Sequence, residues 1–500
     1  MNNNIKKYRN IISVSSLFGG LQIFLILIGA IKGKIIAIYI GSEGVGQLAL
    51  FTSILEIVNL VCTLGFGYSA TRLVSKAHEV NSFYEIRKIL SIVSKILLFS
   101  AFVGTALLIL FSKQISFIFF GNDTLFKSII FLSITVFFTV FLNRNNLFLQ
   151  SFNEYKNLAK SNLIGAFLGL IGSFVFYYYF GINGIVPSII FTSVSLFLSS
   201  SFFFRKLKIK PIRINLKTAI TKGSPMIKLG LVMVLASIVG SIVKNFINIF
   251  IINFGSISDL GFYNAGHTIA LSYVGMIFTA MSYEYFPRLS RISEDNKKVR
   301  KAVNQQSEII FLTLLPILVV LICFTELIIN VFLTSEFYVI IKFIRLLSFS
   351  ILINAGAFTI SYIPIVKGDK KVFFLFNSLI PGIAAITLSS VGYYFGNLTG
   401  LAIGICLVSI VHFSFMVIVC KKLYEFKVTK NFISFFVVNL ITISTAFTIT
   451  NFESNLKYLN IFVLIFSFWY SLYYINKLVD LKEIINNLLI KFRNSLNKKQ

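Results

Sequence analysis

Apolar runs long enough to cross a membrane, separated by short polar segments, follow one another along most of the chain. At about 20 apolar residues per crossing, the pattern predicts fourteen helices, at residues 11–40, 45–70, 88–111, 124–150, 157–180, 184–204, 225–253, 260–285, 304–333, 338–366, 371–395, 398–420, 431–450 and 458–476. Glycine next to Ser, Asn or Asp marks many of the breaks, as is typical of turns. The ten-residue alternation of a membrane β-barrel does not fit these runs. We therefore predict an all-α, polytopic membrane protein.

The first apolar run resembles a secretion signal, because Lys6, Lys7 and Arg9 precede it. However, it continues from Ile11 to Ile31, beyond the roughly 7–15 apolar residues of a signal peptide, and no small-residue cleavage site follows. We expect it to be retained as the first membrane helix.

Composition and charge support a membrane protein. The 500 residues are 56% hydrophobic and only 13% charged, with a net charge of +28, whereas soluble domains carry roughly 25% charged residues. These values exclude a soluble enzyme, a disordered chain and a DNA-binding domain. With fourteen helices, 38 of the 46 Lys and Arg residues fall on one side of the membrane. The positive-inside rule then predicts that both termini are cytoplasmic. Anionic headgroups are the natural neighbours of these charges, so we expect no nucleic-acid partner.

The sequence gives no indication of a metal site, a cofactor or a disulfide. Cys62, Cys323, Cys406 and Cys420 lie far apart in apolar stretches, and the three histidines are scattered. No pair has metal-ligand spacing. The cysteines are expected to be small buried hydrophobes.

An internal repeat divides the predicted helices. The stretch IAIYIGSEGVGQLALFTSI in the first hairpin resembles INIFIINFGSISDLGFYNAGHTI in the seventh and eighth helices, so that Gly46 corresponds to Gly261. Six helices separate the copies, which predicts two parallel six-helix lobes at residues 1–212 and 213–425. Residues 426–500 add two helices and a basic tail. Parallel repeats of this kind are common in secondary transporters.

The residues of the first hairpin resemble those of a known family. Lys34, Tyr39, Gly41, Gly44, Gly46 and Gln47, followed by Gly65 and Gly67, look like the pattern of the O-antigen and polysaccharide flippases. These flippases belong to the multidrug/oligosaccharidyl-lipid/polysaccharide exporter superfamily. The segment Phe286-Pro287-Arg288-Leu289-Ser290 is also similar to that superfamily.

The resemblance implies a flippase of the bacterial inner membrane and not an enzyme. Its substrate would be an undecaprenyl-pyrophosphate-linked oligosaccharide, moved from the cytoplasmic to the periplasmic leaflet by alternating access with ion or potential coupling. Membrane lipids, a polysaccharide polymerase and chain-length proteins are the implied partners. A lipid II flippase, whose substrate has the same pyrophosphate, and a multidrug/cation antiporter of the same fold are alternatives. A glycosyltransferase or polymerase would need a large loop with catalytic groups, and the longest predicted loop, at 205–228, is short and basic.

Cations inside the predicted helices are the candidates for binding a pyrophosphate. Lys32, Lys34 and Lys244 lie within apolar runs, where a charge is costly without a partner or an aqueous cavity. A lysine ammonium suits an anionic pyrophosphate, although each could instead extend to the interface. Lys244 is the first choice, because helices 7 and 8 offer it no acid and only His267 at similar depth. Lys32 and Lys34 point about 200° apart on a helix and cannot share one cavity.

The acids and the remaining basic residues have two interpretations each. Glu56 could neutralise Lys32 or carry a coupling proton. Glu326 and Arg345 lie at similar depth on neighbouring helices, which predicts a structural ion pair, although Arg345 remains a pyrophosphate candidate. Arg72 and Arg288 end helices 2 and 8 at the cytoplasmic face. They would contact headgroups or capture the pyrophosphate first.

Overall fold

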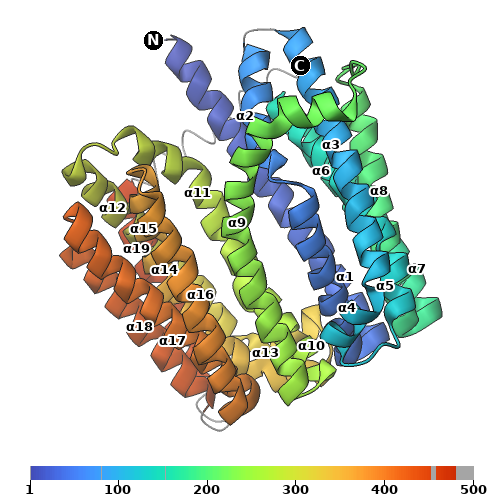
Figure 1. The fold of residues 1–500 in the computed structure, drawn as a ribbon. Coiled ribbons are helices and arrows are strands. Elements are labelled where there is room, and N and C mark those ends of the chain that lie inside the picture. The colour runs from blue at the N-terminus through green and yellow to red at the C-terminus, as the bar shows by residue number, and fades with distance from the viewer. Residues whose placement is uncertain (1, 80–81, 153, 452–457, 480–500) are drawn as a thin grey trace, which may run out of the picture. The chain divides into compact units, whose positions relative to one another are not determined.

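The computed structural model describes residues 2–79, 82–152, 154–451 and 458–479. Every regular element in this part of the chain is helical (Figure 1). Nine helical segments of these described residues are long and apolar enough to cross a membrane. Two of the nine, Tyr155–Arg205 and Lys370–Tyr424, each contain two of the predicted helices, and a third, Leu27–Cys62, contains parts of two. The all-α polytopic fold predicted from the sequence is confirmed.

The predicted turns inside these three segments are present as breaks in the helical backbone. α1 (Asn2–Cys62) bends at Gly41, where φ is 62° and ψ is −166°. A 3-10 turn, η1 (Gly181–Gly184), joins α7 (Tyr155–Phe180) to α8 (Ile185–Arg205). α17 (Ser390–Tyr424) leaves helical geometry at Gly396 and Asn397. Each break coincides with a glycine-containing turn signal in the sequence.

Other predicted helices are interrupted within their span. The second ends at Cys62, and α2 (Phe66–Glu79) begins after a break. The eighth consists of α10 (Ile257–His267), a π-helical turn η2 (Thr268–Ser272) and α11 (Tyr273–Arg291). The ninth is divided into α12 (Asn296–Cys323) and α13 (Thr325–Phe332). A window of apolar residues cannot detect such breaks, because the residues around them are apolar too.

The basic loop predicted at 205–228 is shorter than expected. α9 (Leu216–Phe254) already begins at Leu216, so the second half of the basic segment is helical. Lysine and leucine favour helices strongly, and charges near a helix end can stand outside the apolar core of a membrane. The other elements are α3 (Phe83–Leu110), α4 (Ser112–Phe120), α5 (Phe126–Leu132), α6 (Ile134–Ser151), η3 (Ser335–Ile340), α14 (Ile341–Val366), α15 (Lys370–Phe374), η4 (Leu375–Leu379), α16 (Ile380–Ala384), η5 (Ala385–Ser389), α18 (Lys430–Asn451) and α19 (Leu459–Val479).

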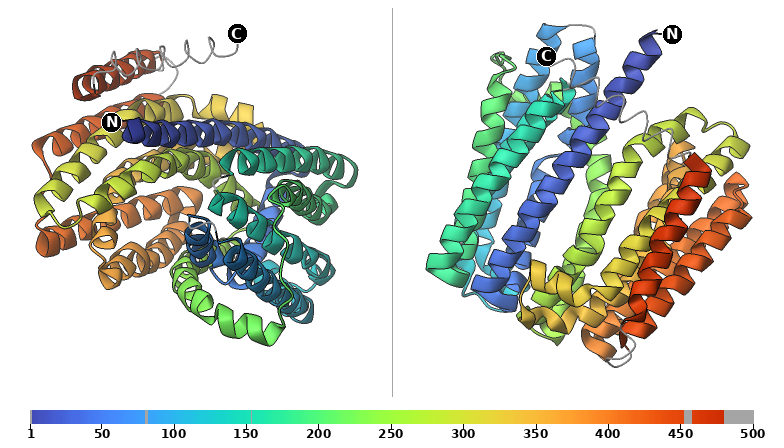
Figure 2. Two further views of the ribbon diagram at one scale, coloured as in Figure 1. Left: turned by 90° about the horizontal axis from the view of Figure 1, so that it is seen from above. Right: turned by 180° about the vertical axis from the view of Figure 1, so that it is seen from behind.

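The chain forms two compact units. The first contains residues 1–268, 329–340 and 385–398, and the second contains 269–328, 341–384 and 399–500. In the first unit α7 and α8 lie side by side, and α1 packs against α7, α9 and α10 (Figure 2). In the second unit α12 is the central helix and packs against α14, α18 and α19. The lobes 1–212 and 213–425 expected from the repeat stay a prediction.

The repeated glycines pack reciprocally in the first unit. A Cβ atom at Gly46 would lie 2.0 Å from the main-chain oxygen of Ile257, at the start of α10. A Cβ atom at Gly261, on α10, would lie 1.9 Å from the main-chain oxygen of Ser42 on α1. Each repeat therefore presents its glycine to the backbone of the other repeat, and only a residue without a side chain permits this approach.

Candidate functional site

The most prominent charged pair of the first unit joins two membrane helices. Lys244 on α9 and Glu56 on the second half of α1 form an ion pair, with Nζ 2.8 Å from Oε2. Their side chains are 41% and 53% exposed on the unit. The two charges therefore neutralise each other while remaining accessible.

Polar residues extend this pair into a seam between α1 and α9. One turn from the ion pair, Asn248 donates a hydrogen bond of 3.2 Å from Nδ2 to Ser53 Oγ. Both helices carry further polar side chains at spacings of three or four residues, which places them on one face. We call the following set the polar seam: Ser53, Glu56 and Asn59 on α1, Thr63 directly after α1, and Ser237, Ser241, Lys244 and Asn248 on α9.

The structure corrects two expectations about these charges. Lys244 was expected to lack an acid, which is wrong, because the acid comes from α1 and not from helices 7 and 8. Of the two interpretations of Glu56, the pairing with Lys32 is not what the structure shows, because Glu56 pairs with Lys244. Lys32 is half-buried and makes no hydrogen bond or ion pair with the described residues. The His267 ring lies edge-on to Tyr263.

Lys34 binds a helix end. Its Nζ donates hydrogen bonds to the main-chain oxygens of Asn330, at 2.6 Å, and Leu333. These carbonyls lie at the C-terminal end of α13, where a cation is favourable. The side chain of Glu336, in η3, accepts from the main-chain N–H and the hydroxyl of Ser42. The Lys34 ammonium is therefore engaged with the backbone of residues 329–340 of its own unit.

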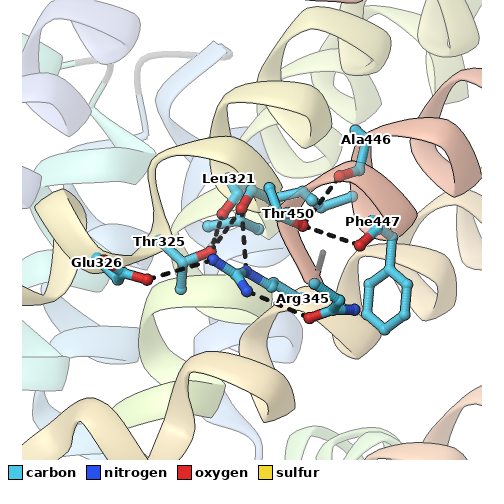
Figure 3. Close-up of polar contacts among 9 residues, drawn as sticks. Leu321, Thr325, Glu326, Arg345, Ala446, Phe447 and Thr450 are labelled. Atoms are coloured by element: carbon cyan, nitrogen blue, oxygen red, sulfur yellow. Dashed lines mark hydrogen bonds and ion pairs between the residues drawn. The ribbon is translucent and has the colours of Figure 1, made fainter. Parts of the chain in front are cut away.

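The predicted pair of Glu326 and Arg345 is confirmed in the second unit. Arg345 Nη2 lies 3.7 Å from Glu326 Oε1, and Figure 3 shows the two side chains pointing toward one another. The Arg345 residue is only 7% exposed. Its Nε donates to the main-chain oxygen of Ile322 (3.2 Å) and its Nη1 to Asn451 Oδ1 (3.4 Å). Arg345 therefore connects α14 to the end of α12 and to α18, which favours a structural role.

Of the two arginines expected at the cytoplasmic face, only Arg288 has a side chain among the described residues. Arg288 donates from Nη2 to Gln306 Oε1 (2.7 Å) and lies over the Tyr285 ring at 5.8 Å. It therefore joins α11 to α12. The side chain of Arg72 lies outside the described residues.

A group of amides on α6 lines a cavity that the sequence did not predict. Asn143, Asn146 and Gln150 line a cavity of about 370 Å³ that is also lined by Thr63 and Ser237 of the polar seam. The run Asn143-Arg144-Asn145-Asn146 in an apolar helix was the available signal. Arg144 and Asn145 point elsewhere: they bond each other, and Asn145 donates to Ser200 and Ser201 of α8.

The described residues offer no obvious metal site. No three His, Cys, Asp or Glu side chains among them form a group that could hold an ion, and all four cysteines are free thiols.

A comparison with known protein families identifies the family to which the chain belongs. A sequence profile described as "Polysaccharide biosynthesis protein" matches residues 35–342, which is more than half of the chain and includes every residue of the polar seam. The chain belongs to this polysaccharide biosynthesis family. No curated protein matches the sequence.

Solved structures of transporters share the fold. The lipid II flippase MurJ in an inward closed conformation is similar at a TM-score of 0.71 and 16% identity, over 93% of this chain and 99% of that one. An inward-facing multidrug resistance MATE family transporter of the MOP superfamily is similar at a TM-score of 0.62 and 15% identity, over 84% and 94%. A MOP superfamily transporter from Pyrococcus furiosus, described as having a binding pocket of reverse polarity, gives 0.56 and 16%, over 87% and 96%. At such identities these likenesses show the fold of this multi-pass membrane protein.

Proposed function

We propose that this protein is a flippase for an undecaprenyl-pyrophosphate-linked oligosaccharide. It moves the lipid from the cytoplasmic to the periplasmic leaflet of a bacterial inner membrane by alternating access. The family match supports a role in polysaccharide biosynthesis, and the fold is one that flippases and exporters share. Both termini are cytoplasmic in this proposal, as the distribution of Lys and Arg predicts.

The accessible ion pair of Lys244 and Glu56 is the observation that carries the proposal. A cation inside a membrane helix needs a partner, and Glu56 is that partner at rest. A pyrophosphate is a stronger competitor, because it brings more negative charge and several acceptor oxygens to one ammonium. The substrate would displace Glu56 from Lys244 and leave the carboxylate without its cation. Lys32, which has no charged partner among the described residues, supplies a second cation on the same unit.

Displacement of Glu56 also provides a route to coupling. A carboxylate that loses its neighbouring cation takes up a proton more readily. Proton uptake by Glu56 when substrate binds, and release when it leaves, would link transport to the proton gradient. His267, on α10 of the same unit, is a further candidate for the coupling proton.

Complementation tests the proposed function. The gene is expressed in a bacterium that lacks its own O-antigen flippase, and surface polysaccharide is measured against intracellular lipid-linked repeat. Restored surface polysaccharide is expected, and Lys244→Ala should strongly reduce the restoration at equal protein level. Lys95→Ala is the matched control, because Lys95 is exposed on α3 and makes no hydrogen bond or ion pair with the described residues. Unchanged polysaccharide together with raised resistance to cationic dyes would instead support a multidrug antiporter.

A further inference from the structure

The cavity lined by α1, α6 and α9 has a composition that the pyrophosphate does not explain. Its volume is about 370 Å³, within the roughly 300–1,000 Å³ of small-molecule pockets. Its described lining holds amides, hydroxyls and apolar groups, and no charged side chain. A site for an anion would be expected to hold Lys or Arg.

Three carboxamides point into this cavity from one helix. Asn143, Asn146 and Gln150 follow one another at intervals of three and four residues on α6, which places them on one face. None of the three makes a hydrogen bond with the described residues, and Asn146 Oδ1 is buried without a partner there. A buried polar atom without a partner is costly unless a ligand or water satisfies it. Each carboxamide offers both donors and an acceptor.

The backbone beside the amides is irregular as well. α1 ends at Cys62, and the chain is non-helical at residues 63–65 before α2 begins. At membrane depth, irregular backbone is tolerated only where it is buried in protein or lines a water-filled cavity. Thr63, at this break, lines the cavity. The cavity is therefore lined by hydroxyl groups and irregular backbone as well as by amides, and this lining is suited to hydroxyl-rich ligands.

We infer that this amide-lined cavity binds the sugar portion of the substrate, a neutral hydroxyl-rich glycan. Sugar hydroxyls donate and accept in the same way as carboxamides, and neutral amides bind them without competing for the pyrophosphate. Thr63 follows Glu56 by seven residues, about 10 Å along α1. A pyrophosphate at Lys244 would then place the first sugars beside Asn143, Asn146 and Gln150. This inference rests on the proposed function and adds the site that recognises the glycan.

Binding of two lipids to the purified full-length protein in nanodiscs tests the inference. The probes are undecaprenyl pyrophosphate and the same lipid carrying N-acetylglucosamine or galactose. Wild type should bind a sugar-bearing lipid more tightly than the bare one. Asn146→Leu and Gln150→Leu should each reduce that preference about 2- to 10-fold, the effect of one hydrogen bond, with the affinity for the bare lipid unchanged. Asn143→Ala, at an exposed position, serves as the variant least able to disturb folding.

Gln114→Leu is the matched control, because Gln114 is an exposed amide on α4 away from the cavity. Its binding should equal that of wild type. An unchanged sugar preference in all three cavity variants, equal binding of both lipids by wild type, or an equal loss of affinity for the bare lipid would overturn the inference and leave the flippase proposal intact. Failure of wild type to bind either lipid would overturn the proposed function itself.

Discussion

Lys244 and Glu56 form an ion pair between α9 and α1, with 2.8 Å between Nζ and Oε2. The two residues are 188 positions apart in the sequence. Since both side chains are partly exposed, the pair contributes little to stability, about 0–1 kcal/mol. Charges inside membrane helices are costly, and this pair contributes little to stability. The pair is therefore better explained by a function than by a structural role.

Exchange of the two charges separates function from structure. Lys244→Glu combined with Glu56→Lys should restore the ion pair and the protein level but not transport, because the cation then stands on α1. Lys244→Arg should retain part of the activity, since the charge persists with altered geometry. Lys244→Ala and Lys244→Glu should reduce flux about 10- to 100-fold, as expected for a lost hydrogen bond to a charged group. Surface polysaccharide normalised to protein level provides the measurement.

Wild-type flux in Lys244→Glu would rule out an anion contact at this residue. Glu56→Gln adds a test of coupling: if Glu56 carries the proton, transport in this variant should lose its dependence on the pH gradient. Transport that still follows the gradient would assign the proton to another group.

The second prediction concerns Arg345 and Glu326, whose environments differ. Arg345→Leu removes an ion pair and two hydrogen bonds from a residue that is only 7% exposed, which should cost about 1–3 kcal/mol of unfolding free energy. Glu326 is 53% exposed on its side chain, so Glu326→Gln should cost less than about 1 kcal/mol. Thermal unfolding of the purified protein in detergent measures both. Equal losses in the two variants would contradict this asymmetry, and a stable Glu326→Gln protein without transport would give Glu326 a functional role.

The charged residues were recognisable from the sequence, but their partners were only partly so. Glu326 and Arg345 lie on consecutive helices joined by a short connection, so matching their depth was enough to predict the pair. Lys244 and Glu56 are brought together by the packing of α9 against α1, which no local pattern encodes. A comparison of depth on neighbouring helices therefore cannot identify Glu56 as the partner of Lys244.

The helices themselves were largely predictable, because membrane crossings need long apolar runs and breaks carry glycine. The amides of α6 were missed for a different reason. Asn145 satisfies the α8 serines, whereas Asn146 points into the cavity, and only the rotation of α6 in the unit distinguishes these adjacent residues. The amides carry no charge, so they were not candidates for binding an anionic pyrophosphate.

The reciprocal contact of the repeated glycines leads to the third prediction. Gly261→Ala places a methyl group against the Ser42 carbonyl, and the backbones of α1 and α10 must separate. Such overpacking should cost about 1–3 kcal/mol. Gly240→Ala, in α9, is the matched control, because a Cβ there meets no atom within 4 Å and alanine favours a helix. Unfolding temperatures should fall for Gly261→Ala and stay level or rise for Gly240→Ala; the reverse order would contradict the contact.

The fourth prediction concerns orientation. Single cysteines are introduced at Lys210 and Asp123 in a protein whose four native cysteines are replaced by alanine. Both positions are exposed, and the loops that hold them are expected on opposite sides of the membrane. A membrane-impermeant maleimide should label Asp123→Cys in intact spheroplasts and Lys210→Cys only after permeabilisation. Labelling of Lys210→Cys from outside would reverse the assigned topology.

The last prediction concerns Lys34 as the C-terminal cap of α13. Its ammonium contacts the carbonyls of Asn330 and Leu333, which no longer have donors within the helix. Lys34→Met keeps the apolar stem and removes the charge, so the end of α13 should open more readily by about 1 kcal/mol. Hydrogen exchange at the amides of Leu333 and Phe337, which bond to Ile329 and Thr334, should accelerate about fivefold, whereas exchange in α8 should not change. Lys34→Arg should retain most of the protection, because a guanidinium also donates to carbonyls. Unaltered exchange in Lys34→Met would show that α13 ends there without this cap, and Lys34 would again be available for an anionic substrate.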